Sequence, residues 1–208
     1  CSSDLGLLDQ ALKVSQNNLP SEEAMQQLHD NSVLGGSSSA DMNTAKNGGG
    51  VRSFGGTVTL LDATKIQGNY ASERGGGIFA NDSSTINLQN TSSIAGNSSD
   101  LGGGGILNVG SAVTLSNSAT ISGNGTLANG GGVYIDYSST TTTLTMNGTS
   151  SIKDNFSFGD GGGVYSNAGT ITMSGSDSGS SSITGNQAGD SEHSAGGGGI
   201  YNDGGTVT

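Results

Sequence analysis

The sequence predicts a parallel β-helix, an all-β solenoid whose coils are about 27 to 31 residues long and carry three strands each. Three observations predict this fold class. A glycine triplet followed by Val or Ile recurs along the chain, and the string Ile-x-Gly/Asp-Asn recurs out of phase with it. Between these two strings lies a segment in which apolar and polar residues alternate.

The glycine triplets mark the period of the repeat. The hydrophobic residues that follow them are Val51, Ile78, Ile106, Val133, Val164 and Ile200, with spacings of 27, 28, 27, 31 and 36 residues. We expect each triplet to form a sharp corner where a Cβ atom would clash or φ is positive. The triplets are not a phosphate-binding loop, because no strand-to-helix pattern surrounds them and no Lys follows.

The alternating segments supply the predicted strands. They are 57–60, 85–88, 112–115, 143–146 and 170–173, and a sixth begins at 206. Alternation with a period of two residues is typical of a strand with one buried face, and no apolar run is long enough for a helix. Stacked coils would bury a narrow column of aliphatic residues, with every strand hydrogen-bonded to the coils above and below it.

The recurring asparagines predict a structural ladder. They are Asn43, Asn69, Asn97, Asn124, Asn155 and Asn186. Since they share one phase of the repeat, we expect their side chains to stack at one turn and to bond to their neighbours. We also expect these asparagines to tolerate a left-handed backbone.

The chain divides into two parts by its pattern. Residues 1–42 are predicted to form a small helical cap and a Gly/Ser linker, with Ser21 as the N-cap of a short helix from Glu22 to His29. Residues 43–208 hold the β-helix repeats, with 35–50 as a linker or an imperfect first coil. We expect the natural protein to continue beyond Thr208, where no capping pattern appears.

Composition limits the function. The net charge of −11 disfavours a nucleic-acid partner, and no run of 18 apolar residues predicts a transmembrane segment. The single cysteine, Cys1, rules out an internal disulfide and a cysteine metal cluster. Cys1 has three interpretations: a lipid anchor, a fragment edge or a sequencing-adapter artefact. We predict no cofactor and no metal site, because His29 and His193 lie in different regions.

Two strings resemble a known family. Ile-Thr-Gly-Asn at 183–186 and Gly-Gly-Gly-Ile-Tyr-Asn at 197–202 resemble the repeats of the chlamydial polymorphic outer membrane proteins, with Gly in place of a typical Ala and Ile in place of a typical Phe. They are similar as well to repeats of gut-bacterial surface proteins and autotransporter passengers. The resemblance covers about 43–208 and implies a right-handed β-helix. It also implies a secreted or cell-surface location, at the outer membrane or cell wall, and a role in adhesion.

The leading functional hypothesis is therefore a non-catalytic bacterial adhesin segment that binds a glycan or protein ligand. Its candidate surface is the stripe that follows the triplet hydrophobes: Phe79, Leu107, Tyr134, Tyr165 and Tyr201. With a period of two these side chains point away from the core, where aromatic rings stack on sugars or partner proteins. The competing interpretation is that aromatic residues simply favour strands and stack on one another.

Two alternatives remain open. A polysaccharide lyase or glycosidase would need paired carboxylates, and the candidates are Asp154 with Asp160 in one turn and Asp190 with Glu192 in the 187–195 insertion. The competing interpretation is that these carboxylates are charges in solvated loops, since the repeats carry few of the cations that a lyase would need as a base. A more remote alternative is ice binding by a Thr-x-Thr face, which Asn87 and Ala112 interrupt.

Overall fold

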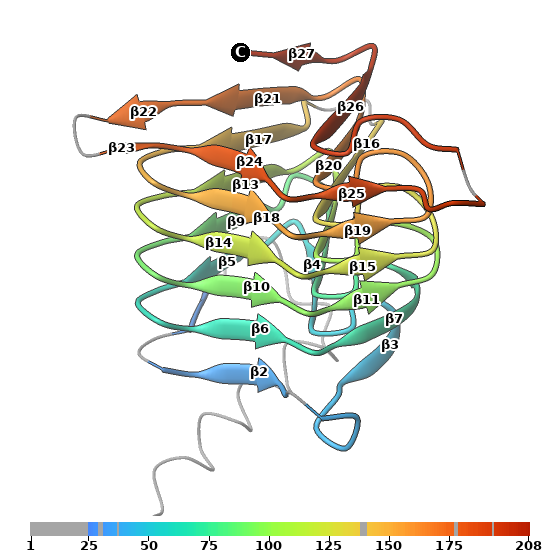
Figure 1. Ribbon diagram of the computed structural model, residues 1–208. Helices are drawn as coiled ribbons and strands as arrows, with labels where there is room; N and C mark the ends of the chain where they lie inside the picture. Colours follow the sequence, from blue (N-terminus) through green and yellow to red (C-terminus); the bar gives the residue numbers. More distant parts are fainter. Residues whose placement is uncertain (1–24, 29–30, 37, 138–140, 177–178, 193) are drawn as a thin grey trace, which may run out of the picture.

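The computed structural model describes residues 25–28, 31–36, 38–137, 141–176, 179–192 and 194–208. These residues contain no helix and form a solenoid with four parallel sheets, here named A to D in the order A, B, C, D along each coil (Figure 1). The predicted parallel β-helix is confirmed. A separate two-stranded antiparallel hairpin interrupts the path between sheets A and B in one coil.

The strands have the following bounds. Sheet A consists of β1 (Met25–Leu28), β5 (Thr57–Leu60), β9 (Thr85–Leu88), β13 (Ala112–Leu115), β17 (Thr143–Met146), β21 (Thr170–Met173) and β27 (Thr206–Val207). Sheet B consists of β2 (Val33–Gly35), β6 (Lys65–Gln67), β10 (Ser93–Ala95), β14 (Thr120–Ser122), β18 (Ser151–Lys153) and β24 (Ser182–Thr184). Sheet C consists of β3 (Thr44–Asn47), β7 (Tyr70–Arg74), β11 (Ser98–Ser99), β15 (Gly125–Thr126), β19 (Phe156–Ser157) and β25 (Gln187–Ala188). Sheet D consists of β4 (Val51–Phe54), β8 (Ile78–Asn81), β12 (Ile106–Val109), β16 (Val133–Asp136), β20 (Val164–Asn167) and β26 (Ile200–Asp203), and the hairpin pairs β22 (Gly175–Ser176) with β23 (Gly179–Ser180).

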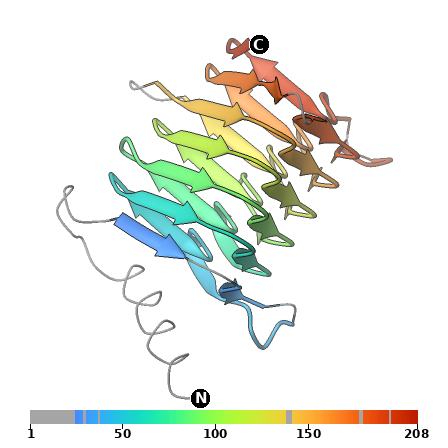
Figure 2. The ribbon, with the colours of Figure 1, turned by 90° about the vertical axis from the view of Figure 1, so that its left-hand side faces the viewer.

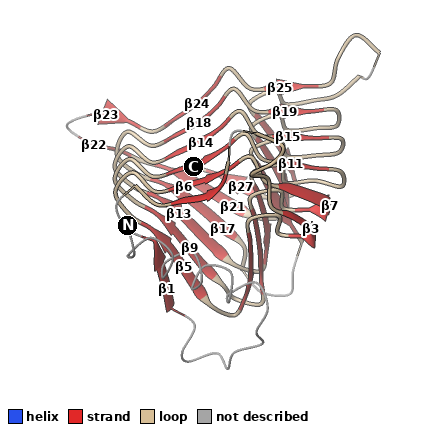
Figure 3. Cartoon of the chain, turned by 90° about the horizontal axis from the view of Figure 1, so that it is seen from below, coloured by secondary structure: helices blue, strands red, loops and turns tan. Residues whose placement is uncertain are grey.

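The coil is right-handed. In Figure 1 the near strands of sheet B run to the right, the more distant strands of sheet A run to the left, and the chain climbs from blue to red. Successive coils lie directly on one another in the side view (Figure 2), and the view along the axis shows the sheets as separate walls (Figure 3). This is the handedness that parallel β connections generally favour.

Each coil has four strands, so the prediction of three was wrong in number. The three predicted strands form sheets D, A and B, and the additional strand is the short one in sheet C. Most of its members are two residues long, and their inward side chains are small or polar, such as Ser99, Thr126 and Ser157. A strand without an apolar alternation gives no signal in the sequence.

The N-terminal region also differs from the expectation. Residues Met25–Leu28, inside the predicted helix from Glu22 to His29, form strand β1 and pair in parallel with β5. Strand β2 pairs with β6, so parallel pairing begins before residue 43. A strand here continues the ladder of sheet A, and its backbone hydrogen bonds outweigh a local helical pattern. The rest of the predicted cap, including Ser21, lies outside the described residues.

The core is a narrow column of aliphatic side chains. Equivalent residues pair rung over rung, as in Ile66, Ile94 and Ile121 of sheet B, and the one register shift among the described strand pairs lies between β3 and β7. These three side chains are fully buried, as are Ile78 and Leu115 on other walls. Because each aliphatic residue is covered by its counterparts above and below, a chain with 30% hydrophobic residues excludes water along the axis.

The glycine triplets form the corner between sheets C and D. The first glycine of a triplet has a positive φ, which is 64° at Gly103. A Cβ atom on the second, Gly104, would lie within 2.6 Å of the carbonyl oxygen of Gly131 in the next coil. Backbone atoms cannot move aside as a side chain can, so the corner requires glycine.

The six asparagines stack at the corner between sheets B and C. Asn97 Nδ2 donates to Asn124 Oδ1 at 3.0 Å, the backbone N–H of Asn97 donates to the same oxygen at 2.9 Å, and the pattern repeats along the column. Asn124 Nδ2 also donates to the carbonyl of Ile94 in the preceding coil. In five of the six coils the left-handed backbone falls on the residue before the asparagine, such as Gly96 or Asp154, and in none on the asparagine itself; Met42, before Asn43, is the exception. The ladder therefore satisfies buried backbone groups on the inner side of this corner.

Candidate functional site

The outer face of sheet D carries two columns of side chains. The first, named here the aromatic column, contains Arg52, Phe79, Leu107, Tyr134, Tyr165 and Tyr201 in register. The second, the flanking column, lies two residues further along each strand and contains Phe54, Asn81, Val109, Asp136, Asn167 and Asp203. Period-two alternation places both columns outside the core.

The rings of the aromatic column contact one another. Tyr134 and Tyr165 meet edge to face, with centroids 4.8 Å apart, and Tyr165 and Tyr201 stack with centroids 5.4 Å apart. All three rings are partly exposed, as is Phe79. Leu107 differs, since it lies in the column but is fully buried. The exposed aromatic surface is therefore concentrated in the last three members of the column.

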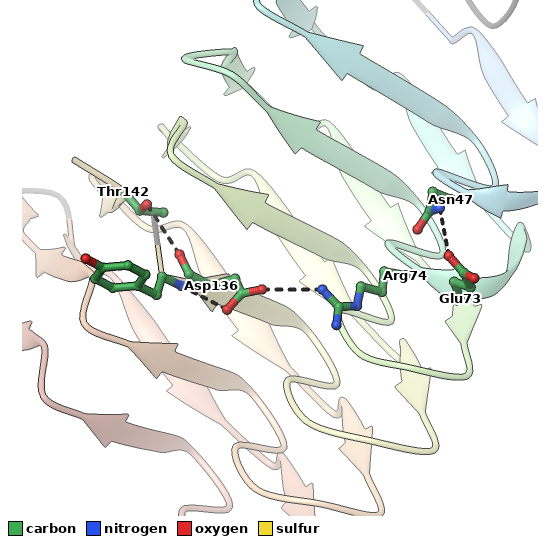
Figure 4. Close-up of polar contacts among 6 residues, drawn as sticks. Asn47, Glu73, Arg74, Asp136 and Thr142 are labelled. Carbon is green, nitrogen blue, oxygen red and sulfur yellow. Dashed lines mark hydrogen bonds and ion pairs between the residues drawn. The ribbon is translucent and has the colours of Figure 1, made fainter. Parts of the chain in front are cut away.

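Two arginines contact groups of this face. The guanidinium carbon of Arg52 lies 5.7 Å from the ring centroid of Phe79, which is a cation–π contact. Arg74 Nη1 lies 3.4 Å from Asp136 Oδ2, and this ion pair joins the coils on either side of the one that carries Leu107 (Figure 4). Asp136 Oδ1 accepts a hydrogen bond from the backbone N–H of Tyr137, which orients the carboxylate.

Carboxylates and burial shift the tyrosines toward their neutral form. Burial raises the pKa of Tyr134 to about 12, and the Asp136 carboxylate adds to the shift. Burial also raises the pKa of Tyr165, with further contributions from Asp203 and Asp160. Burial and the nearby carboxylates both disfavour a phenolate. The carboxylates also place the rings in a negative electrostatic environment.

The predicted pair Asp154 and Asp160 does not share a turn. The two residues lie on opposite sides of strand β19. Asp154 takes the left-handed position that glycine occupies in four other coils, with a φ of 55°. Asp160 Oδ1 accepts a hydrogen bond from the N–H of Gly196 at 2.7 Å, which ties together two connections between sheets C and D. Both residues thus have a structural role, and catalysis by them stays a prediction.

The second predicted pair forms a local turn. Asp190 Oδ1 accepts a hydrogen bond from the backbone N–H of Glu192 at 2.8 Å, and both side chains are exposed. This is the usual arrangement of an Asp that caps its own loop. In the described part of the chain, no group of three or more His, Cys, Asp or Glu residues is placed to hold a metal ion.

The threonine face lies on sheet A, on a different wall from the aromatic column. Its outward residues form two columns: Thr57, Thr85, Ala112, Thr143, Thr170 and Thr206, and then Thr59, Asn87, Thr114, Thr145 and Thr172. As expected from the sequence, Ala112 and Asn87 interrupt the array. Ice binding by this face stays a prediction.

Sequence reasoning missed the polar residues beside the aromatic column. Asp136 and Asp203 stand two positions after Tyr134 and Tyr201, so the same alternation that placed the tyrosines places these carboxylates beside them. Tyr137, which is 67% exposed, was missed for another reason. It stands outside the repeat, in the connection that follows strand β16.

Comparison with known proteins matches part of the chain to a repeat family. Residues 180–203 match the family model of the Chlamydia polymorphic membrane protein (Chlamydia_PMP) repeat. The matched segment runs from the end of the hairpin through β24 and β25 to the end of β26, which is close to one coil. No curated protein and no solved structure gives a significant match. Within the described residues there is no helix of the length and apolarity needed to span a bilayer.

Proposed function

We propose that this parallel β-helix, whose repeat resembles that of the Chlamydia polymorphic membrane proteins, is a surface-exposed or secreted segment that binds a glycan or protein ligand without catalysis. The ligand surface is the outer face of sheet D. The observation that carries the proposal is the register of Tyr134, Tyr165 and Tyr201 on three neighbouring coils, partly exposed and flanked by carboxylates.

Physical arguments favour this face over the other walls. Partly exposed tyrosines give a large contact area at a small cost in side-chain entropy, and they carry hydroxyls for hydrogen bonds. A solenoid holds these side chains on strands and not on loops, so the surface is ordered before a ligand arrives. Sheet B, by contrast, presents mainly small polar residues such as Ser93, Thr120 and Ser151.

The resemblance supports the location. The matched family model is named for membrane proteins of Chlamydia, and we extend from it only an outer-membrane or cell-surface association. A lipid anchor at Cys1 remains part of this proposal, although Cys1 lies outside the described residues.

The experiment compares ligand binding by the wild type and by a variant with Tyr134, Tyr165 and Tyr201 changed to Ala. Both are applied to a glycan array and to cell surfaces. We expect the triple variant to lose most binding, because the changes remove the ring surface. The matched control changes Thr143, Thr145 and Thr170 on sheet A to Ala, and it should bind like the wild type. Unaltered binding by the tyrosine variant, with its fold verified by circular dichroism, would remove the role of sheet D.

A further inference from the structure

The two halves of the sheet D face differ in how their negative and aromatic groups are partnered. From β4 to β16, named here the N-terminal half, the chain supplies its own cations. Arg52 lies over Phe79, and Arg74 pairs with Asp136. The Phe79 ring and the Asp136 carboxylate are thus each contacted by a guanidinium, from the neighbouring coil for Phe79 and from two coils away for Asp136, and the ion pair partly neutralises the carboxylate.

The C-terminal half, formed by β20 and β26 and the connections that lead into them, has equivalent groups but no lysine or arginine of its own. It presents Tyr165, Tyr201 and the exposed carboxylate of Asp203. The sequence contains no Lys or Arg after Lys153, and Lys153 lies in β18 of sheet B, on another wall. The negative charge here is therefore not balanced by a lysine or arginine from its own coils.

Other observations indicate that a partner group at this half would be positively charged. Asp160 lies in the coil of Tyr165, and Asp203 lies in the coil of Tyr201. The two carboxylates therefore approach the ring stack from neighbouring coils, and such coils are spaced about 4.8 Å apart along the axis. Their field contributes to the raised pKa of Tyr165. One oxygen of Asp160 bonds to Gly196, whereas Asp203 is exposed on the outer face.

We propose that the C-terminal half of this face, formed by Tyr165, Tyr201, Asp160 and Asp203, binds Lys or Arg side chains of a partner polypeptide. This inference rests on the proposed function and names the partner class. A basic segment lying along the axis repeats on this half the contacts that Arg52 and Arg74 make on the other. The net charge of −11 also attracts such a segment from a distance.

A neutral glycan fits this half less well. Tyr165 stacks on Tyr201 at an interplanar angle of 3° and meets Tyr134 on its other side. The stack already occupies one face of Tyr165, and a sugar ring needs a free face for stacking. A guanidinium or ammonium group can instead approach the ring edge and hydroxyl while it pairs with a carboxylate.

The test measures binding of two fluorescent peptides by polarisation. One is a Gly-Ser peptide that carries three arginines, and the other has glutamine at the same three positions. We expect the arginine peptide to bind about tenfold more tightly or better, because three cation contacts add up. Its affinity should fall as ionic strength rises, since the contacts are exposed to solvent.

Variants locate the site and separate this inference from the proposed function. Asp203→Asn should weaken the arginine peptide about two- to fivefold, which is typical of one exposed ion pair, and leave the glutamine peptide unchanged. Tyr201→Ala should weaken the arginine peptide as well. The matched control is Asp62→Asn, an exposed carboxylate at the turn between sheets A and B, which should have no effect.

The outcomes that overturn the inference are distinct. Equal binding of the two peptides, or no binding of either, rejects a cationic partner. Loss of a neutral glycan in the tyrosine variants, with no effect of Asp203→Asn, also rejects it but leaves the proposed function of sheet D in place. Loss of arginine-peptide binding in both Asp203→Asn and Tyr201→Ala supports it.

Discussion

Two asparagine ladders run along this solenoid and differ in burial. The inner ladder closes the corner between sheets B and C, where Asn97 and Asn124 are each 1% exposed. The outer ladder lies at the turn between sheets A and B. There Asn117 Nδ2 donates to Asn90 Oδ1 at 2.9 Å, and Asn90 Nδ2 donates to Asp62 Oδ1 at 3.0 Å, all in solvent.

The two ladders also differ in which residue has a left-handed backbone. In the outer ladder the ladder residues themselves are left-handed, with φ of 59° at Asn90 and 60° at Asn117. In the inner ladder the preceding residue takes that conformation, so the asparagine side chain points inward and satisfies two backbone groups of the preceding coil. Hydrogen bonds to buried groups cannot be replaced by water, so the same residue type at the same spacing has very different energetic weight.

The largest effect is expected for Asn124→Ala in the inner ladder. The change leaves the N–H of Asn97 and the carbonyl of Ile94 without these partners and removes a donor to Asn155 Oδ1. Each buried group left unpaired costs about 1–3 kcal/mol, so we expect the free energy of unfolding to fall by about 3–5 kcal/mol. Urea denaturation followed by circular dichroism measures it. A loss below about 1 kcal/mol would show that the ladder does not depend on burial.

A smaller effect is expected for Gly123→Ala, just before the inner ladder. Gly123 has a φ of 61°, and an added Cβ atom would meet only the backbone nitrogen of Gly96, at an ordinary contact distance of 4.0 Å. The cost is then only the left-handed backbone, about 1–2 kcal/mol in the free energy of unfolding. Gly123→Asn is the matched variant and should cost less, because Asp154 takes this position in the next coil. Equal losses for Ala and Asn would mean that contacts, and not φ, decide this corner.

An effect of intermediate size is expected from pH, through the partly buried phenol of Tyr134 in the aromatic column. Burial and Asp136 raise the pKa of Tyr134 to about 12, above its ordinary value of 10.0. The folded state therefore holds this proton more tightly than the unfolded state, and the stability from the neutral phenol is lost as pH rises from 10 toward 12. In Tyr134→Phe the decline in urea midpoint across this range should be shallower. An identical decline in both proteins would assign it to other groups.

The smallest effect is expected for Asn117→Gly in the outer ladder. The variant loses the exposed bond to Asn90 but keeps the left-handed backbone, and Gly148 already takes this conformation at the turn after β17. We expect the free energy of unfolding to change by about 0.5 kcal/mol or less. A loss as large as that of Asn124→Ala in the same urea experiment would remove the distinction between the ladders.

The sequence by itself determined the solenoid, its period and the alignment of equivalent residues. Glycine triplets, alternating segments and Asn124 with its counterparts recur at one phase, and only stacking of identical coils gives every member the same environment. The same periodicity by itself places Tyr134, Tyr165 and Tyr201 on one outer face. Local signals sufficed here because each coil contacts mainly its neighbours.

The tertiary structure decided what has no periodic signature. The short strands of sheet C became visible only through pairing between coils, because inward residues such as Ser99 carry no apolar pattern. Strand β1 replaced a predicted helix because sheet A offered it a partner. The Arg74–Asp136 ion pair joins residues 62 positions apart, across an intervening coil. Contacts of this kind depend on how far a side chain reaches in space, which spacing along the chain does not encode.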